Sequence, residues 1–277
     1  MKLAEALEVA TRTDPGRVRS HNEDAVFGSA EQGLVILADG MGGYNAGEVA
    51  SGMATTLLAS NFGRLLKQVG HCQPLAVDAD TGKRVSHRHI EEEVASANSA
   101  IYNTAQSQPQ YAGMGTTLVM AWFYENQVTV AHIGDSRLYR LRDGDFRVIT
   151  RDHSLLQEQL DSGMITAEEA RHSQNKNLVT RALGVDPVVE PEIHDYEVEP
   201  GDIYLLCSDG LNDMVDDEEI GLTVQTLAAN LELAADQLIQ MANDNGGRDN
   251  VSVILVKVRG DFAVPRGWWQ KLLAWLK

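Results

Sequence analysis

The sequence predicts an α+β fold in which antiparallel β-sheets are covered on the outside by helices. Apolar segments of strand length recur along the chain, and short turns such as Glu125-Asn126 and Asp143-Gly144 join some of them as hairpins. Two long segments with helical apolar faces follow one another in the first half. Because hairpins outnumber strand–helix–strand crossovers, the pattern favours antiparallel sheets with helices packed outside them.

The first half of the chain places strands before the two long helices. We predict strands over residues 4–13, 25–27 and 34–38 and helices over residues 47–66 and 90–105. Residues 34–38 form a continuous apolar run, which is typical of a buried strand. Residues 67–89 contain proline and glycines and predict an exposed excursion. Its potential metal ligands do not have the spacing of a zinc site: His71, Cys72, His87 and His89.

The second half returns to strands after a polar interruption. We predict strands over residues 116–124, 127–133, 138–141, 203–208 and 251–258 and helices over residues 211–215 and 222–241. Residues 150–184 contain few apolar side chains, with helix starts near a cap at Asp152 or Ser154 and again at Thr166. We expect this segment to form a flap that stands off a single domain over residues 1–260, with a tail over residues 261–277.

Composition and charge narrow the classes of partner. The 277 residues include 23 Lys and Arg against 40 Asp and Glu, a formal charge of −17. A surface this acidic is a poor match for nucleic acid or an anionic membrane, so we predict no nucleic-acid partner. The carboxylates do supply many candidate ligands for divalent ions that prefer oxygen.

Cysteine usage and the apolar runs indicate a cytoplasmic protein. Cys72 and Cys207 do not form a disulfide framework, which fits a reducing compartment. The first sixteen residues lack the apolar core of a signal peptide. No run reaches the roughly 18 apolar residues of a membrane span, so we expect no transmembrane helix.

Acidic residues recur where predicted strands begin or end. Adjacent carboxylates at such corners repel one another unless a cation neutralises them. Six residues share this placement: Glu23, Asp24, Asp39, Asp135, Asp209 and Asp249. Together they predict a pocket for two or more divalent ions, and the absence of His and Cys from these corners favours magnesium or manganese over zinc. Arg19, four residues before Glu23, is placed to bind a phosphate, so the pattern predicts metal-assisted phosphoester hydrolysis.

Two other interpretations of the glycine-rich corners rank below this one. The glycines after Asp39 lie between a strand and a helix, as in a dinucleotide-binding loop, but their spacing differs and Asp39 would repel a pyrophosphate. Ser136 follows a Gly-Asp pair, yet it has no nucleophile-elbow context and no evident base.

A set of motifs in one consistent order resembles the bacterial PPM family of type 2C serine/threonine protein phosphatases. The resemblance covers residues 11–258 and rests on RSHNEDA, ADGMGGYNAGEVAS, GMGTT, HIGDSRLYRLRDG, TRDHSLLQEQLDSGMIT, TRALG, CSDGLNDMV and GGRDNVSVI. It implies an α-β-β-α sandwich of two antiparallel sheets flanked by helix pairs. It also implies hydrolysis of phosphoserine and phosphothreonine on proteins by a metal-bridging hydroxide, opposing a Hanks-type kinase, in a monomeric enzyme.

The resemblance also implies roles for the corner residues. Asp39 would bridge two manganese or magnesium ions. Further ligands would come from the Gly40 carbonyl and the carboxylates of Asp209 and Asp249. Glu23 and Asp24 would hold metal-bound waters or a metal directly, and Asp135 with Asp209 would hold a third, weaker ion. Arg19 would bind the substrate phosphate, and Asn250 would support Asp249. Two rival functions are a catalytically silent phosphoprotein-binding regulator and a two-metal phosphodiesterase.

Four features depart from the family pattern, and the first is the excursion over residues 67–89, which is longer than in compact members. Met41 occupies the place of a histidine that is proposed as a general acid in eukaryotic relatives. The flap has Ser173-Gln174-Asn175-Lys176 where a proline and an arginine are usual. The tail beyond residue 260 ends in RGWWQKLLAWLK, an amphipathic segment with three cations. A helix docked on the domain is slightly favoured for it, and contact with a membrane surface or a partner protein is the alternative.

Overall fold

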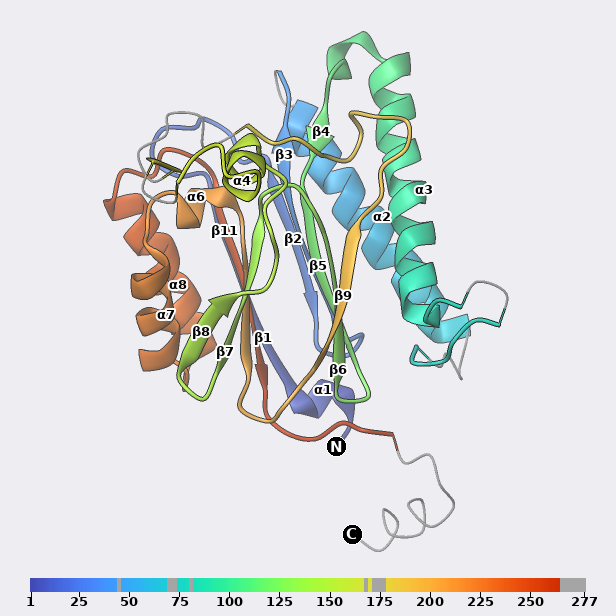
Figure 1. The fold of residues 1–277 in the computed structure, drawn as a ribbon, viewed down its shortest axis with the longest axis vertical. Helices are drawn as coiled ribbons and strands as arrows, with labels where there is room; N and C mark the ends of the chain where they lie inside the picture. Colours follow the sequence, from blue (N-terminus) through green and yellow to red (C-terminus); the bar gives the residue numbers. More distant parts are fainter. Residues whose placement is uncertain (44–45, 69–73, 80–81, 167–168, 171–177, 265–277) are drawn as a thin grey trace, which may run out of the picture.

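The protein is a four-layer sandwich of two antiparallel sheets between two layers of helices (Figure 1). The computed structural model describes residues 1–43, 46–68, 74–79, 82–166, 169–170 and 178–264. One sheet has the order β1 (Leu7–Asp14), β11 (Val251–Val258), β10 (Ile203–Cys207), β7 (Arg137–Arg142), β8 (Asp145–Val148). The other has the order β2 (Asp24–Ser29), β3 (Leu34–Met41), β5 (Leu118–Tyr124), β6 (Gln127–Ile133), β9 (Glu192–Glu197), with β4 (Gly115–Thr116) beside β3. The predicted sandwich is confirmed.

Each sheet has its own cover of helices (Figure 1). Helices α2 (Ala46–Gln68) and α3 (Val85–Ser107) pack on the sheet that contains β3. Helices α7 (Asp217–Thr226) and α8 (Leu231–Asp244) cover the sheet that contains β11, next to the short α6 (Asp209–Asn212). Short helices elsewhere in the described residues include α1 (Leu3–Ala6), α4 (Leu155–Asp161) and a 3₁₀ turn at Pro109–Tyr111.

Strand β3 shows why its sequence is apolar on both faces. Leu34 and Ile36 belong to the core under α2 and α3, whereas Val35 and Leu37 belong to the core between the sheets. Side chains alternate across a strand, and both faces of β3 are covered, so neither face needs polar residues. The strand therefore carries Asp39 out of a rigid, fully packed layer to one end of the sandwich.

Two expectations about the helices require correction. The first strand starts later than predicted, because residues 3–6 form α1 and only Leu7–Asp14 forms β1. The helix predicted over residues 222–241 is two helices, α7 and α8, separated by residues 227–230. The Asn230 side chain caps α8 by accepting a hydrogen bond from the Leu233 N–H, so this local bond starts a second helix.

The sequence pattern also missed regular structure in two places. Helix α3 begins at Val85, so the last part of the predicted excursion is helical, and its His87 contacts Asp195 at 2.7 Å. Strand β9 was not predicted. It is an edge strand with charged residues on its outer face, and pairing with β6 rather than an apolar pattern defines it.

The flap is tied to the domain at both ends. Ser154 is the cap of α4, since its Oγ accepts a hydrogen bond from the Gln157 N–H. A β-bridge joins Ser154 to Val179, and another joins Thr116 to Leu183. The predicted departure at residues 173–176 and the tail beyond Val264 lie outside the described residues. Within the described part of the chain, no helix has the length and apolar character needed to cross a membrane.

Candidate metal centre

The predicted corner residues converge on one hollow of about 230 Å³ at one end of the sandwich. Five of the six carboxylates line it, although they come from five separate places in the sequence. The predicted residues on its wall are Arg19, Glu23, Asp39, Gly40, Asp135, Asp209 and Asp249. They share it with Met41, Gly42, Thr117 and Val179. Antiparallel packing explains the convergence, because strand ends and strand starts meet at the same edge of each sheet.

Asp24 lies behind the hollow rather than on its wall. It pairs directly with Asp39 across the β2–β3 ladder. Its Oδ2 accepts a hydrogen bond of 2.8 Å from the Ser208 hydroxyl, whereas its Oδ1 is buried without a hydrogen-bond partner. A buried carboxylate oxygen without a partner is costly, and a cation is one group that would satisfy it.

The carboxylates in the hollow disfavour one another's charge. Burial, reinforced by Asp24 and Asp209, raises the pKa of Asp39 well above its usual range. Burial and the charge of Asp135 do the same to the pKa of Asp209. Burial raises the pKa of Asp135 to about 6, with a further contribution from Asp152. A centre of this kind is complete only when positive charge offsets the carboxylates.

The donor set fits hard divalent cations. Carboxylate and carbonyl oxygens surround the hollow, and no His or Cys is present among the described residues on its wall. Magnesium and manganese prefer such oxygen ligands. The unpartnered Asp24 Oδ1 and the raised pKa values of Asp39 and Asp209 are consistent with the same conclusion.

Glycine at position 40 allows the backbone to approach closely at the centre. A Cβ atom there would lie 2.2 Å from the Gly47 carbonyl oxygen and 2.6 Å from that of Glu23. The Gly40 N–H donates a 3.1 Å hydrogen bond to the Glu23 carbonyl. The end of β3, the start of β2 and the start of α2 are therefore pressed together, which brings Glu23 next to Asp39.

Arg19 forms an ion pair with one of the carboxylates. Its Nη2 lies 2.7 Å from Asp249 Oδ2, and its side chain is about half exposed, at 53%. The hydrogen bond to Asp249 raises the pKa of the guanidinium further. Among the described residues on the wall, Arg19 supplies the positive charge that partly offsets the carboxylates.

Asn250 joins three segments beneath the centre. Its Oδ1 accepts a 2.8 Å hydrogen bond from the Glu23 N–H, and its Nδ2 donates to the carbonyls of Pro15 and His21. Its own N–H donates to Asp249 Oδ1 at 2.9 Å. The Asn250 backbone therefore contacts Asp249, and its side chain holds the loop that carries Glu23.

Sequence reasoning missed Thr117, which binds both sides of the Asp39 peptide. Its Oγ1 accepts a 3.0 Å hydrogen bond from the Asp39 N–H, and its N–H donates a 2.8 Å bond to the Asp39 carbonyl. The same hydroxyl contacts the Ser136 hydroxyl at 2.8 Å. Thr117 lies in the GMGTT motif, which was the available signal, but no local pattern indicates what its hydroxyl contacts.

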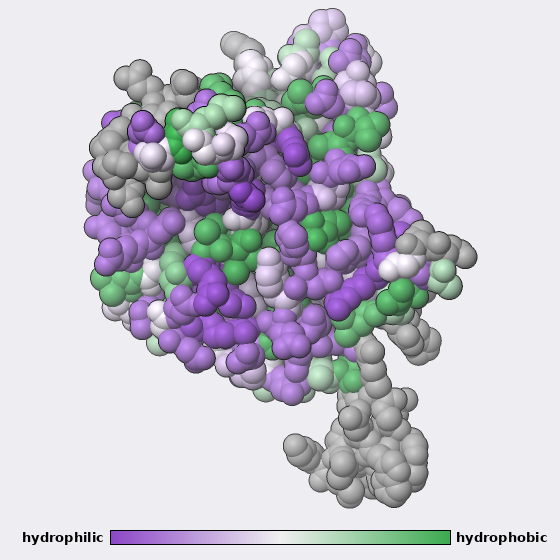
Figure 2. Space-filling model, viewed as in Figure 1, coloured by the Kyte–Doolittle hydropathy of each residue, from purple (hydrophilic) through white to green (hydrophobic). Residues whose placement is uncertain are grey.

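A second, larger hollow adjoins the centre beneath α4, and Asp135 and Asp209 line both hollows. It measures about 600 Å³ and has Leu156 and Leu160 of α4 on one wall. Acidic residues around the start of α7 form another wall. Hydrophilic residues dominate this part of the surface (Figure 2).

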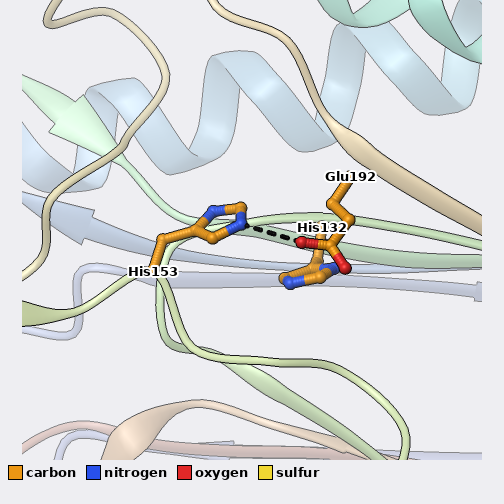
Figure 3. Close-up of side chains that lie close together, drawn as sticks. All are labelled: His132, His153 and Glu192. Atoms are coloured by element: carbon orange, nitrogen blue, oxygen red, sulfur yellow. Dashed lines mark hydrogen bonds and ion pairs between the residues drawn. The ribbon is translucent and has the colours of Figure 1, made fainter. Parts of the chain in front are cut away.

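The sequence analysis also missed a histidine pair that lies beside the centre. His132 and His153 stack with ring centroids 4.8 Å apart, and Glu192 of β9 lies against both (Figure 3). His153 and Glu192 contact each other through Nε2 and Oε2 at 3.4 Å. Both rings are buried, and the burial lowers the pKa of each.

Fold and site together define a class: two-sheet sandwiches that collect carboxylates for divalent ions at one end. A family model, protein phosphatase 2C, matches residues 16–253. The serine/threonine phosphatase stp of Listeria welshimeri is 40% identical over 249 residues, which cover 89% of this chain and 94% of that protein. The chain belongs to the protein phosphatase 2C family.

Solved structures agree with this assignment. The Mycobacterium tuberculosis serine/threonine phosphatase PstP/Ppp superposes with a TM-score of 0.80 at 39% identity, covering 92% of this chain and 99% of that one. The PstP catalytic domain in complex with two manganese ions superposes with a TM-score of 0.77 at 40% identity, with 92% and 99% coverage. The predicted family, fold and enzyme class, a protein-serine/threonine phosphatase, are confirmed.

Proposed function

We propose that this chain hydrolyses phosphoserine and phosphothreonine in proteins at the hollow that contains Asp39, with manganese or magnesium as cofactor. The observation that carries the proposal is the convergence of five carboxylates, the Gly40 backbone and Arg19 on one wall. The manganese complex of the related PstP domain supports the choice of metal. Two divalent ions supply an activated water nucleophile and neutralise charge on the phosphate in reactions of this class.

The residues divide into metal-holding and phosphate-binding groups. Asp39 would hold both core ions, because, besides burial, the charges of Asp24, Asp209 and Asp135 all raise the pKa of its carboxyl group. Asp209, Asp249 and the Gly40 carbonyl would complete the two sites. Glu23 and Asp24 would hold the outer ligands, and Asp135 with Asp209 would hold a third, weaker ion.

Arg19 would orient the substrate. Its guanidinium now pairs with Asp249, which a bound cation would engage instead. A half-exposed guanidinium at the mouth of the hollow suits bidentate contact with a phosphate. Met41, which lines the same wall, carries no proton to give to a leaving group, so that proton would come from water rather than from residue 41.

Manganese-dependent hydrolysis of p-nitrophenyl phosphate tests the assignment. Asp39→Ala should abolish the activity, whereas Asp186→Ala, at an exposed carboxylate outside the hollow, should leave it unchanged. Activity that survives Asp39→Ala would refute the proposed centre. A phosphopeptide should turn over and bis-p-nitrophenyl phosphate should not; the reverse preference would favour a phosphodiesterase.

The physiological partners would be phosphorylated proteins and a Hanks-type serine/threonine kinase whose products this enzyme reverses. The enzyme would act as a cytoplasmic monomer. Incubation with the autophosphorylated kinase encoded nearest to its gene tests this, with phosphate release measured for wild type and Asp39→Ala. Release by wild type alone is expected, and a kinase that keeps its phosphate in both reactions would exclude that pairing.

A further inference from the structure

His153 binds the Gly134 peptide from both sides. Its backbone N–H donates a 2.9 Å hydrogen bond to the Gly134 carbonyl, and its ring Nδ1 accepts a 3.2 Å hydrogen bond from the Gly134 N–H. Gly134 has a φ of +102°, and a Cβ there would lie 2.7 Å from the Thr117 side chain. The corner that ends β6 is therefore held by residue 153 at a position where the backbone has little freedom.

This contact determines the tautomer of the His153 ring. A backbone N–H can only donate, so Nδ1 must accept and the ring proton must lie on Nε2. Nε2 faces Glu192 Oε2 at 3.4 Å, where that proton is donated to the carboxylate (Figure 3). Glu192 Oε1 is held in turn by His194 Nε2 at 2.7 Å. The carboxylate of β9 thus orients the ring, and the ring orients Gly134.

The same tautomer argues against a metal at this cluster. His132, His153 and Glu192 place ligand atoms within 4.8 Å of one another. However, both nitrogens of His153 are engaged, one as acceptor and one as donor. His132 Nε2 donates to the Arg151 carbonyl at 2.8 Å, and its ring stacks on that of His153. The cluster is built as a hydrogen-bonded support.

The hydrogen-bonded histidine cluster holds Gly134 and so supports the next residue, Asp135. Asp135 is buried at 7% exposure and lines the proposed metal centre with Asp39 and Asp209. On the other side, His153 directly precedes Ser154, the cap of α4 in the flap. One side chain therefore connects the start of the flap to the corner that aims Asp135 into the centre.

We propose that His153 is a positioning residue that sets the Gly134–Asp135 corner for cation binding, with Glu192 as its orienting partner. The inference rests on the proposed function of the hollow. It assigns no chemistry to His153 itself, because the ring faces a backbone amide and a carboxylate rather than the hollow.

Two polar substitutions of His153 distinguish a role in positioning Gly134 from a role in packing. In His153→Asn the amide oxygen replaces Nδ1 and still accepts from Gly134, whereas in His153→Gln the amide replaces Nε2 and leaves Gly134 unpaired. In metal-free protein, hydrogen exchange of the Gly134 amide should accelerate about tenfold in His153→Gln and remain near wild type in His153→Asn. The manganese concentration for half-maximal activity should rise about tenfold in His153→Gln only.

Control variants complete the test. His194→Gln should change neither quantity, because the Gln amide nitrogen replaces Nε2 and still donates to Glu192 Oε1. Glu192→Ala, at the partly exposed edge strand, should change the exchange rate and the manganese requirement in the same direction as His153→Gln. This variant keeps the test informative if His153→Gln does not fold. Equal behaviour of the Asn and Gln variants, or faster exchange without a change in manganese requirement, would overturn the proposal. A wild-type protein without phosphatase activity would refute the proposed function instead, and the exchange comparison would still report on the contact.

Discussion

At the scale of single residues, the centre combines side chains that bind ligands with side chains that hold the binders. Asp39 illustrates both, since its carboxylate lines the hollow while Thr117 holds its peptide through two hydrogen bonds. Removal of a side chain that holds a ligand-binding residue should weaken the geometry of the centre. Removal of a ligand-binding side chain should reduce its activity directly.

Arg19 is a side chain that would bind the ligand directly. Arg19→Ala should lower kcat/KM for p-nitrophenyl phosphate by about 10- to 100-fold, because a charge-assisted hydrogen bond to phosphate contributes roughly 1.5–3 kcal/mol. The effect should be mainly on KM if the contact forms equally in the ground state. Steady-state kinetics at saturating manganese measure it. Arg17→Ala, at an exposed arginine outside the hollow, is the matched control, and an equal loss in both variants would contradict the assignment.

Asp135 gives the metal-free protein a specific pH dependence. Its pKa is about 6 when folded, above the value near 3.9 of an unfolded Asp, so the folded state holds the proton more tightly. This contribution is favourable at low pH and is lost as pH rises from about 4 to about 6. By the difference in pKa it amounts to about 3 kcal/mol.

Urea denaturation of wild type and Asp135→Asn in a chelator, from pH 4.5 to 7.5, measures this effect. The variant should gain stability relative to wild type as pH rises through that window, because it lacks the carboxylate that must ionise in a buried place. A difference between the two proteins that does not change with pH would contradict it. Manganese should stabilise wild type more than the variant at pH 7.5.

At the scale of elements, the end of β3 depends on close backbone contact. Gly40→Ala should abolish activity and lower stability, since the new Cβ would meet backbone oxygens of Gly47 and Glu23 that cannot move aside. Gly43→Ala, three residues further along the chain, is the matched control, because a Cβ there would meet no atom of the described residues within 4 Å. Thermal unfolding and p-nitrophenyl phosphate turnover measure both. Similar damage in the two variants would show that loop flexibility, rather than close approach, is what the glycines provide.

Other elements show which sequence signals succeed. Strand β3 was predicted because burial on both faces leaves a continuous apolar run. The cap of α4 was narrowed to Asp152 or Ser154 because a cap acts within three residues, and the structure has Ser154. Strand β9 was missed because its only regular partner is β6, some sixty residues earlier, and its outer face is charged. The break between α7 and α8 was missed because residues 222–241 keep an apolar face on both sides of it.

At the scale of the whole molecule, the end of the sandwich opposite the metal centre offers a docking surface for the C-terminal tail. A hollow of about 690 Å³ there is lined by Leu3, Leu66 and Trp122, and Val264, the last described residue, also lines it. Phe262 is buried, and its N–H donates to Asn126 Oδ1 at 2.8 Å. A tail docked on the domain stays the prediction, and this hollow would be its contact surface.

Truncation after Val264, which keeps Phe262, tests this preference. The shortened protein should melt a few degrees lower, as expected for the loss of about 1–2 kcal/mol of packing. It should co-sediment with phosphatidylglycerol vesicles no less than the full chain does. Vesicle binding that disappears on truncation, with an unchanged melting temperature, would instead establish the membrane interpretation.

The sequence by itself determined the family, the sandwich and the identity of the acidic corners. The family and the sandwich follow from the resemblance of the ordered motifs to the type 2C phosphatases, whereas the antiparallel sheets and the acidic corners follow from apolar runs, turn residues and carboxylates at strand boundaries. Only the tertiary structure decided that Asp24 lies behind Asp39, that Arg19 pairs with Asp249, and that His153 binds Gly134. Each of these contacts joins segments that fold next to one another for reasons of packing, such as Asn250 and Glu23, 227 positions apart. Local patterns record which groups the chain supplies, whereas their partners depend on how the sheets and loops pack.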